Sequence, residues 1–244
     1  MSRRNSRTDM VPPCTFLVCL LLLLHPANSQ SHEATFQTEE GQAEGTYIGN
    51  IVEASGITGP FYLSPDPSDT QLLQHLSIDE HTGVIRSGLS LDRETRDFYE
   101  LLAVSTSQGQ VVTVKVQVTD INDNAPEFVG SYTPSLTEAA PIGTSVFQLT
   151  AQDRDIGVNA EITFSILSTP GTHSDWFNVD PASGLIMTRV IVDREIDPSP
   201  RITIDATDHG TPAMSTTIQV TVTLLDFNDN EPLDQVFYSP LCVC

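Results

Sequence analysis

The chain has 244 residues, which is enough for one or two domains of ordinary size. Its 32 Asp and Glu against 11 Lys and Arg give a formal net charge of −21 at pH 7. A polyanion such as nucleic acid would be repelled, so no nucleic-acid partner is expected and multivalent cations are the better counterpart.

The first 29 residues have the pattern of a secretory signal peptide. Three arginines precede an apolar run from Phe16 to Leu24, and Ala27-Asn28-Ser29 offers a small-residue cleavage site. A buried N-terminal helix is the alternative interpretation of the same run. No second run of about 20 apolar residues follows, so no transmembrane segment is expected beyond the signal peptide. The protein is therefore expected to be extracellular, either secreted as this chain or held at the plasma-membrane surface as part of a longer protein.

The cysteines predict a folded region without disulfides. Cys14 and Cys19 fall in the signal peptide, Cys242 and Cys244 stand near the end, and residues 30–241 contain none. The fold must therefore rely on its own core or on metal. The Cys242-x-Cys244 pair is interpreted as a free tail, with a metal site or an intermolecular disulfide as alternatives.

The rest of the chain contains an internal repeat. Residues 78–85 (IDEHTGVI) match residues 179–186 (VDPASGLI). Residues 91–94 (LDRE) match residues 192–195 (VDRE) at the same spacing. Two matched segments at one spacing indicate two copies of one structural unit.

Strand patterns fill both copies. Residues 110–118 and 216–224 alternate apolar and polar side chains, which is typical of strands with one face on a core. Shorter β-branched runs are expected to form further strands: Tyr47–Val52, Gly83–Arg86, Phe98–Val104, Ser145–Thr150, Glu161–Leu167, Gly184–Val190 and Arg201–Ala206. No helical period is sustained. The fold class is therefore predicted to be all-β, with two tandem seven-stranded Greek-key β-sandwiches.

An acidic segment, Asp120-Ile121-Asn122-Asp123-Asn124-Ala125-Pro126, joins the two copies and recurs as residues 226–232. It alternates side-chain oxygens with backbone carbonyls, which are the ligands that Ca²⁺ prefers. We therefore expect a first domain over residues 30–126, a calcium-binding linker at its end and a second domain over residues 127–232. Residues 233–244 would be a short C-terminal tail, the start of a truncated third repeat.

Eight carboxylates are expected to converge where the two domains join, because loops at one end of a sandwich lie close together. They are Glu40, Asp92, Glu94, Asp120, Asp123, Asp153, Asp155 and Asp208. Without cations each close pair would cost about 1 kcal/mol in water and about 4 kcal/mol at an effective dielectric constant of 20. About three Ca²⁺ ions, each with 6–8 oxygen ligands, would offset most of this charge.

The same carboxylates allow two other interpretations, an EF-hand loop and a glycosidase active site. An EF-hand loop would need a glycine where Ala125 stands. Asp92 and Glu94 could form a glycosidase pair, but they recur as Asp193 and Glu195, and a catalytic pair is not expected once per repeat. The chain is therefore not expected to be an enzyme.

These motifs together look like the extracellular repeats of the cadherin superfamily. The resemblance covers residues 34–232 and rests on the opening Glu40, the Asp-Arg-Glu motif, the Asp-x-Asn-Asp-Asn-x-Pro linker, the Asp153-x-Asp155 pair and Asp208. It implies that the bound ion is Ca²⁺. It also implies that the partners are other cadherin-superfamily ectodomains, in homophilic or heterophilic pairs.

The resemblance also implies a ligand set for each of three ions. The first ion would be held by Glu40, Asp92, Glu94 and Asp123. The second would share Glu40, Glu94 and Asp123 and add Asp120, the Ile121 carbonyl and Asp155. The third would use Asn122, the Asn124 carbonyl, Asp153, Asp155, the Asn159 carbonyl and Asp208.

The two copies differ in their ligands. The second copy carries a set for a following domain, an incomplete second site made of Glu138, Asp193, Glu195, Asp226 and Asp229. The first copy lacks the acidic ligands of the second, with these residues in their places: Ser55 for Asp153, Ile57 for Asp155 and Ser107 for Asp208. The first copy is therefore expected to be an outermost repeat.

The amino-acid sequence of residues 78–85 and 91–94 is similar to that of the first repeat of Dachsous- and Fat-like protocadherins. No tryptophan lies near the mature N-terminus, as strand-swapping cadherins would require, and Trp176 is expected in the core. The implied function is calcium-dependent cell adhesion by a calcium-rigidified recognition module. The alternative is a secreted, truncated cadherin that acts as a soluble antagonist of the full-length adhesion receptor.

Overall fold

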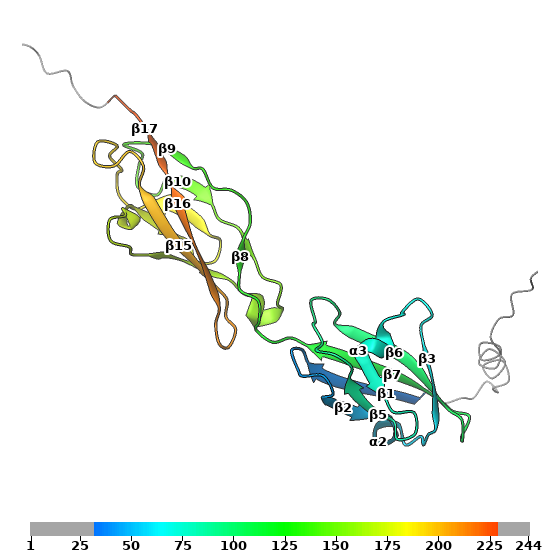
Figure 1. Cartoon of the computed structure of the whole chain (residues 1–244). Helices are drawn as coiled ribbons and strands as arrows, with labels where there is room; N and C mark the ends of the chain where they lie inside the picture. The colour runs from blue at the N-terminus through cyan, green and yellow to red at the C-terminus, as the bar shows by residue number, and fades with distance from the viewer. Residues whose placement is uncertain (1–31, 229–244) are drawn as a thin grey trace, which may run out of the picture. The chain divides into compact units, whose positions relative to one another are not determined.

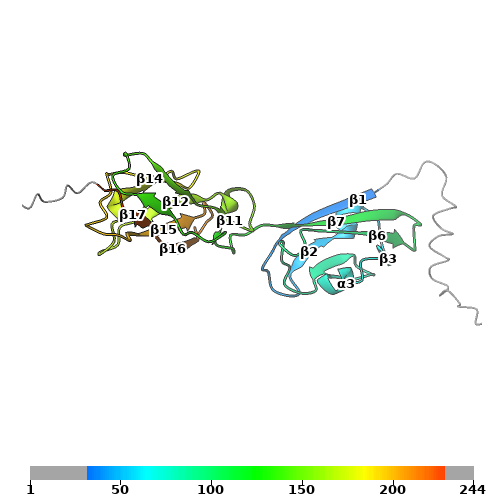
Figure 2. The same ribbon diagram turned by 90° about the horizontal axis from the view of Figure 1, so that it is seen from above.

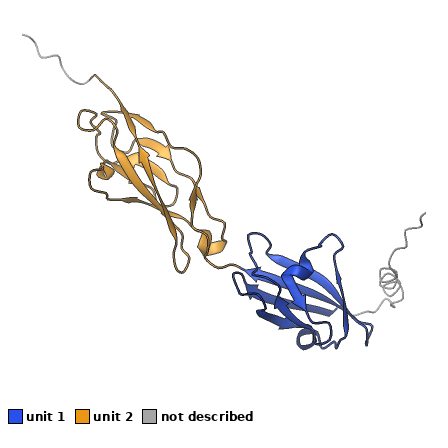
Figure 3. Ribbon diagram, in the orientation of Figure 1, with its two compact units in different colours: residues 1–119 blue, residues 120–244 orange. Residues whose placement is uncertain are grey.

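The computed structural model describes residues 32–228, which form two compact units. Unit 1 ends at Thr119 and unit 2 begins at Asp120, so the acidic linker is part of unit 2 (Figure 3). The expected signal peptide, the C-terminal tail with its two cysteines, and Asp229 lie outside the described residues. Between residues 32 and 228, no helix is long and apolar enough to cross a lipid bilayer.

Unit 1 is a β-sandwich with two short helices (Figure 1). Its elements are, in chain order, β1 (His32–Glu39), β2 (Tyr47–Asn50), α2 (Ile51–Ser55), β3 (Phe61–Pro65), α3 (Leu72–His75), β4 (Leu76–Ile78), β5 (Val84–Ser87), β6 (Phe98–Ser105) and β7 (Val111–Thr119). One sheet has the order β1-β7-β6-β3 and the other β2-β5-β4. The number of strands is the seven that the sequence predicts, but β1, β3 and β4 lie in ranges where no particular strand was expected.

The core of unit 1 follows the alternation seen in the sequence. Val112, Val114, Val116 and Val118 of β7 are at most 1% exposed, while the residues between them are partly exposed. β1 runs parallel to β7, with Ala34 opposite Val114. Burial of apolar surface stabilises the fold by about 25 cal/mol per Å². The sandwich therefore has a source of stability that lies apart from its acidic residues.

The prediction of a strand over Tyr47–Val52 is wrong at the C-terminal end, because the strand ends at Asn50 and helix α2 begins at Ile51. The Asn50 Oδ1 accepts hydrogen bonds from the backbone N–H groups of Val52 (2.8 Å) and Glu53 (3.4 Å). An Asn side chain in this position caps a helix N-terminus. Gly56, in the left-handed conformation with φ 73°, ends the helix. Capping at both ends therefore overrides the strand preference of the β-branched residues between them.

Unit 2 is a second β-sandwich, seen from another side in Figure 2. Its elements are β8 (Glu127–Phe128), β9 (Ser135–Thr137), β10 (Ser145–Gln148), β11 (Ala151–Gln152), η1 (Gly157–Ala160), β12 (Thr163–Leu167), η2 (Ser174–Trp176), β13 (Phe177–Val179), β14 (Leu185–Thr188), β15 (Arg201–Thr207), β16 (Ser215–Thr221) and β17 (Thr223–Leu225). The sheets have the orders β12-β15-β16, β10-β14-β13, β17-β9 and β11-β8. Three of the expected long strands are each divided into two shorter ones: β8 with β9, β10 with β11, and β16 with β17. When each divided pair is counted once, unit 2 has the seven strands that the sequence predicts.

The core of unit 2 contains Trp176, as expected, at 8% exposed. It packs with Phe177, Ile202 and Ile204 among the buried residues of both sheets. The predicted strand over residues 216–224 divides at Val222, because β16 pairs antiparallel with β15 whereas β17 pairs parallel with β9. The alternation of apolar and polar residues continues while the chain passes from one sheet to the other. The sequence therefore does not reveal that the strand divides here.

Ala139 is the only non-glycine residue with a positive φ (57°) in the described chain. Gly41 holds the matching place in unit 1 with φ 68°. Each follows a buried glutamate, and each donates its N–H to the carbonyl of the residue before an Asp-Arg-Glu motif. The left-handed conformation is strained for alanine but not for glycine. Unit 2 therefore tolerates a strain that unit 1 avoids.

Replacing Ala139 by Gly should raise the free energy of unfolding of unit 2 by about 1 kcal/mol, because the strain is removed. Trp176 is the only tryptophan of the chain, so its fluorescence during urea unfolding reports unit 2 alone. The matched control Gly41→Ala should destabilise unit 1 by a similar amount and leave the fluorescence transition unchanged. A less stable Ala139→Gly variant would contradict the interpretation.

Candidate metal centre

Side chains of the linker hydrogen-bond to the loop that follows β11. The Asn159 Nδ2 donates to Asp120 Oδ2 at 2.8 Å, and the Ile156 N–H donates to the same oxygen at 3.3 Å. The Asn124 Nδ2 donates to Asp155 Oδ1 at 2.7 Å. This loop and the linker together therefore carry several of the predicted calcium ligands.

The linker backbone turns back on itself between these contacts. The Asp123 N–H donates to the Ile121 carbonyl at 3.0 Å. The Asn124 Nδ2 also donates to Asp123 Oδ1 at 2.8 Å. The linker therefore forms a tight turn around Ile121 and Asp123.

Asn122 lies against the loop that follows β15. Its Nδ2 donates to the Pro212 carbonyl at 2.6 Å and to Asp208 Oδ2 at 3.2 Å. A Cβ atom on Gly210 would lie 2.1 Å from Asn122 Cγ, so only glycine leaves room for this side chain. Gly210 was not expected as a functional residue. Its place two residues after Asp208 is the only signal of its role in the sequence.

Two buried oxygens in the described part of unit 2 have no hydrogen-bond partner. They are Asn122 Oδ1 and Asp153 Oδ2. Leaving a buried polar atom unpaired costs about 1–3 kcal/mol, and more for a charged group. Asp155 and Asp208, whose charges act on Asp153, are only 5% and 2% exposed. Unpaired oxygens among buried carboxylates fit a hard cation with oxygen ligands, such as Ca²⁺.

Asp153 and Glu94, one in each unit, have raised pKa values. Burial raises the pKa of Asp153, and the charges of Asp155 and Asp208 raise it further. Burial likewise raises the pKa of Glu94 in unit 1 to about 7, and the charge of Glu40 adds to the effect. The ionised forms are thus disfavoured, and a cation would relieve this cost.

Glu40, Asp92 and Glu94 form an acidic cluster in unit 1. Carboxylate oxygens of the three lie within 4.8 Å of one another, and Glu40 is only 1% exposed. The Arg93 N–H donates to Glu40 Oε2 at 2.7 Å. The Glu40 N–H donates to the carbonyl of Thr119, the last residue of β7, at 3.1 Å. The cluster is therefore tied to the end of unit 1 from which the linker continues.

A matching cluster in unit 2 contains Glu138, Glu195 and Asp226. Carboxylate oxygens of these three also lie within 4.8 Å of one another, and Glu138 is 2% exposed. Two backbone N–H groups donate to the Glu138 carboxylate, at 2.7 and 2.9 Å. Asp193, expected in this second site, is outside the group of three, and its Oδ1 accepts the Glu195 N–H at 2.9 Å.

Hydrogen bonds between neutral groups close the matching end of unit 1. The strand registers place Ser107 at the position that Asp208 has in unit 2, as the sequence predicts. The Ser107 hydroxyl donates to the Gly59 carbonyl at 3.0 Å, and the Ser105 hydroxyl donates to the Thr58 carbonyl at 2.6 Å. Unit 1 thus has serine hydroxyls where unit 2 has carboxylates.

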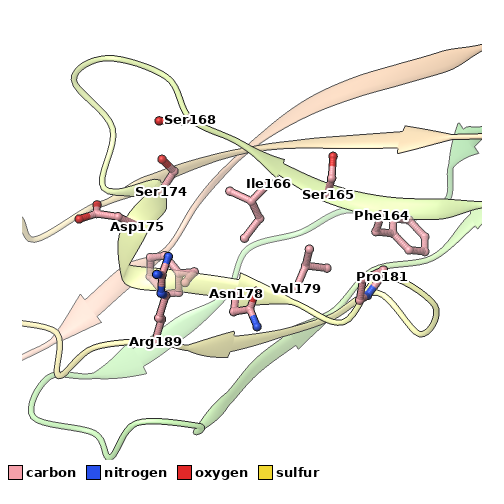
Figure 4. Close-up of a pocket in the computed structure, with 11 residues that line it drawn as sticks. Phe164, Ser165, Ile166, Ser168, Ser174, Asp175, Asn178, Val179, Pro181 and Arg189 are labelled. Carbon is pink, nitrogen blue, oxygen red and sulfur yellow. The ribbon is translucent and has the colours of Figure 1, made fainter.

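A separate cavity of about 380 Å³ opens in unit 2 between the edge strands β12 and β13 (Figure 4). Ile166 and Val179 point toward one another across it. Asp175 and Arg189 are the charged residues of its lining, which includes none of the expected calcium ligands. The acidic clusters, rather than this cavity, are therefore the candidate metal centre.

Comparisons with known proteins point to one family. Residues 132–225 match the cadherin domain. Protein dachsous of Drosophila melanogaster is 45% identical over 158 residues, which is 62% of this chain and 4% of that protein. Protocadherin Fat 2 of Mus musculus is 33% identical over 221 residues, which is 86% of this chain and 5% of that protein. The chain therefore spans only about a twentieth of the length of these relatives.

Solved structures agree with these sequence matches. The protocadherin gammaB7 EC3-6 cis-dimer structure is similar with a TM-score of 0.65 and 30% identity, covering 84% of this chain and 48% of that one. Human CDH23 EC21-23 has a TM-score of 0.66 over 84% of this chain and 72% of that one, at 24% identity, which speaks for the fold alone. Matches to cadherin proteins rather than to enzymes support the expectation that the chain is not an enzyme.

Replacing Asp153 by Asn should stabilise unit 2 in chelator at pH 7. The Asp153 pKa is raised in the folded state, so the folded chain holds more protons than the unfolded chain. Stability is then greatest at low pH and falls as the pH rises from about 4 through the raised pKa. The Asn variant should lack this fall, which urea unfolding followed by Trp176 fluorescence measures at several pH values.

The matched control is Asp175→Asn, at an exposed acidic residue of the same unit that belongs to neither acidic cluster. It should leave the pH dependence as in the wild type. An Asp153→Asn variant that is less stable than the wild type at pH 7 in chelator would show that the charge does not oppose folding.

Proposed function

Because this chain belongs to the cadherin superfamily, we propose that it is a calcium-dependent cell-adhesion module that acts outside the cell. The observation that carries the proposal is the pair of buried, unpartnered oxygens, Asn122 Oδ1 and Asp153 Oδ2, among nearly buried carboxylates. Oxygen ligands of this kind suit Ca²⁺, which takes 6–8 of them. The secretory pattern of residues 1–29 supports the extracellular location.

In this proposal, unit 1 and the linker supply ligands to the same ions. Glu40 is hydrogen-bonded to Thr119, and Asp120 follows Thr119 directly in the chain. Consecutive Cα atoms are only about 3.8 Å apart, so chain connectivity supports sharing. The first two ions would use the cluster of Glu40, Asp92 and Glu94 with the acidic linker residues. The third would use Asn122 and the acidic loops of unit 2.

The chain's own residues have three separate tasks in this arrangement. Backbone N–H groups fix the buried carboxylates, as the Gly210 and Met214 N–H groups do for Asp208 at 2.9 and 3.0 Å. Gly210 leaves space for Asn122. The linker turn presents its carbonyls. When bound, calcium supplies the positive charge that offsets repulsion among the carboxylates, and the linker is expected to stiffen as a result.

The cluster of Glu138, Glu195 and Asp226 would bind calcium more weakly. It offers fewer ligands than the first site, and calcium affinity depends on the number and charge of the ligands. The stiffened module would present a recognition face to other cadherin-superfamily ectodomains, in homophilic or heterophilic pairs.

The chain should bind about three Ca²⁺ ions at its stronger sites, with dissociation constants of about 10⁻⁴–10⁻³ M. Asp155→Ala should remove at least one of them, because Asp155 is assigned to two ions. Titration calorimetry of the full chain measures both. The control Asp175→Ala removes an exposed carboxylate of unit 2 that belongs to neither acidic cluster. Equal calcium binding by the two variants would refute the assignment.

Beads coated with the chain should aggregate in about 1 mM Ca²⁺ and disperse in chelator, if recognition is homophilic. If recognition is heterophilic, they should instead join beads coated with a dachsous or Fat 2 ectodomain. Beads that carry the Asp155→Ala chain should aggregate less, and those with Asp175→Ala should behave as the wild type. Absence of calcium-dependent aggregation in every combination would contradict the adhesion role.

A further inference from the structure

Arg93 places a cation inside the acidic cluster of unit 1. Its side chain is only 11% exposed. The guanidinium forms an ion pair with the Glu94 carboxylate through Nη2, and its Nε lies 4.0 Å from Glu40 Oε1. Two of the three clustered carboxylates are therefore within reach of one guanidinium.

Arg194 has the matching place in unit 2 but is less engaged. Its backbone N–H donates to Glu138 Oε2 at 2.9 Å, as the Arg93 N–H does to Glu40. Its side chain, however, is 42% exposed, and Nη1 lies 3.6 Å from Asp226 Oδ1. Both units thus have the hydrogen bond from the arginine N–H to the buried glutamate, whereas only in unit 1 is the arginine guanidinium largely buried.

The buried carboxylate of Glu40 needs a positive charge close to it in order to stay ionised. The Glu40 side chain is 1% exposed, and a buried carboxylate without a partner is strongly disfavoured. Arg96 and Lys115 of unit 1 form ion pairs outside the cluster, with Asp69 and Glu33. Arg93 is therefore the cation of unit 1 that is positioned to neutralise Glu40 and Glu94.

We propose that Arg93 is the counter-cation of this cluster when no calcium is bound, and that its guanidinium competes with calcium for Glu40 and Glu94. The inference rests on the proposed calcium function and adds a regulating residue that is not itself a ligand. Calcium can use these carboxylates fully only when the guanidinium withdraws. Arg93 then sets the calcium concentration at which the site fills.

This competition links stability and affinity in one thermodynamic cycle. Arg93→Gln removes the charge but keeps the backbone N–H that holds Glu40. The calcium-free chain should lose stability, while the calcium-bound chain should change little. Because linkage is reciprocal, calcium affinity must rise by the factor that corresponds to the difference between these two changes.

The experiment compares wild type, Arg93→Gln, Arg93→Lys and Arg86→Gln as full chains. Arg86 bonds to the Gly45 carbonyl at 3.0 Å outside the cluster, so its loss controls for net charge. Titration calorimetry with Ca²⁺ alone measures affinity. Hydrogen exchange of β1 and β7 in chelator and in calcium measures the stability of unit 1. Arg93→Gln should bind calcium roughly tenfold more tightly and exchange faster in chelator, with Arg93→Lys intermediate and Arg86→Gln near the wild type.

Unchanged or weaker calcium binding by Arg93→Gln would overturn the competition, as would an equal gain in Arg86→Gln. Unchanged exchange in chelator would overturn the counter-cation role. A wild-type chain that takes up no calcium would contradict the proposed function and the competition together. Faster exchange of Arg93→Gln in chelator would even then support the counter-cation role, so the two failures are distinguishable.

Discussion

Backbone N–H groups that hold buried carboxylates are the interaction on which the ends of both sandwiches depend. Glu40, Glu138 and Asp208 are at most 2% exposed, yet each accepts hydrogen bonds from the main chain, Glu40 and Glu138 from distant loops and Asp208 from its own loop. Such bonds to a charged acceptor are stronger than those between neutral groups. They hold these carboxylates in fixed positions at the ends of the strands.

Apolar and acidic residues are therefore separated along each unit. The valines of β7 and the isoleucines of β15 form cores that exclude water, whereas the acidic groups gather where strands end. Cores of this kind obtain their stability from apolar burial and need no cation. In the calcium-dependent function that we propose, calcium would act on the linker and the loops, while the cores of the two sandwiches would stay folded without it.

Much of this was accessible from the sequence, because alternation marks strands and duplicated motifs mark the acidic clusters. Three features were not. Asn50 and Gly56 cap the two ends of α2 within a run of residues that favour strands, and the two caps together outweigh that preference. The division of a strand at Val222 depends on which sheet each half joins. The space that Gly210 leaves for Asn122 depends on residues far apart in the chain. Local patterns predict local structure, and these features are set by tertiary contacts or by capping residues.

The two units have the same arrangement of strands, but the loops at one end carry charged residues in unit 2 and neutral residues in unit 1. Where unit 2 has Asp208, unit 1 has Ser107, whose hydroxyl bonds directly to a backbone carbonyl, and helix α2 follows β2 where unit 2 carries Asp153 in a loop. Neutral hydrogen bonds satisfy their own atoms and leave nothing for an ion, whereas paired carboxylates leave both charge and lone pairs. The same strand order thus supports a closed end in unit 1 and a cation-demanding end in unit 2. A few loop residues therefore decide whether the end of a sandwich carries candidate ion ligands, and the strand order is the same in both cases.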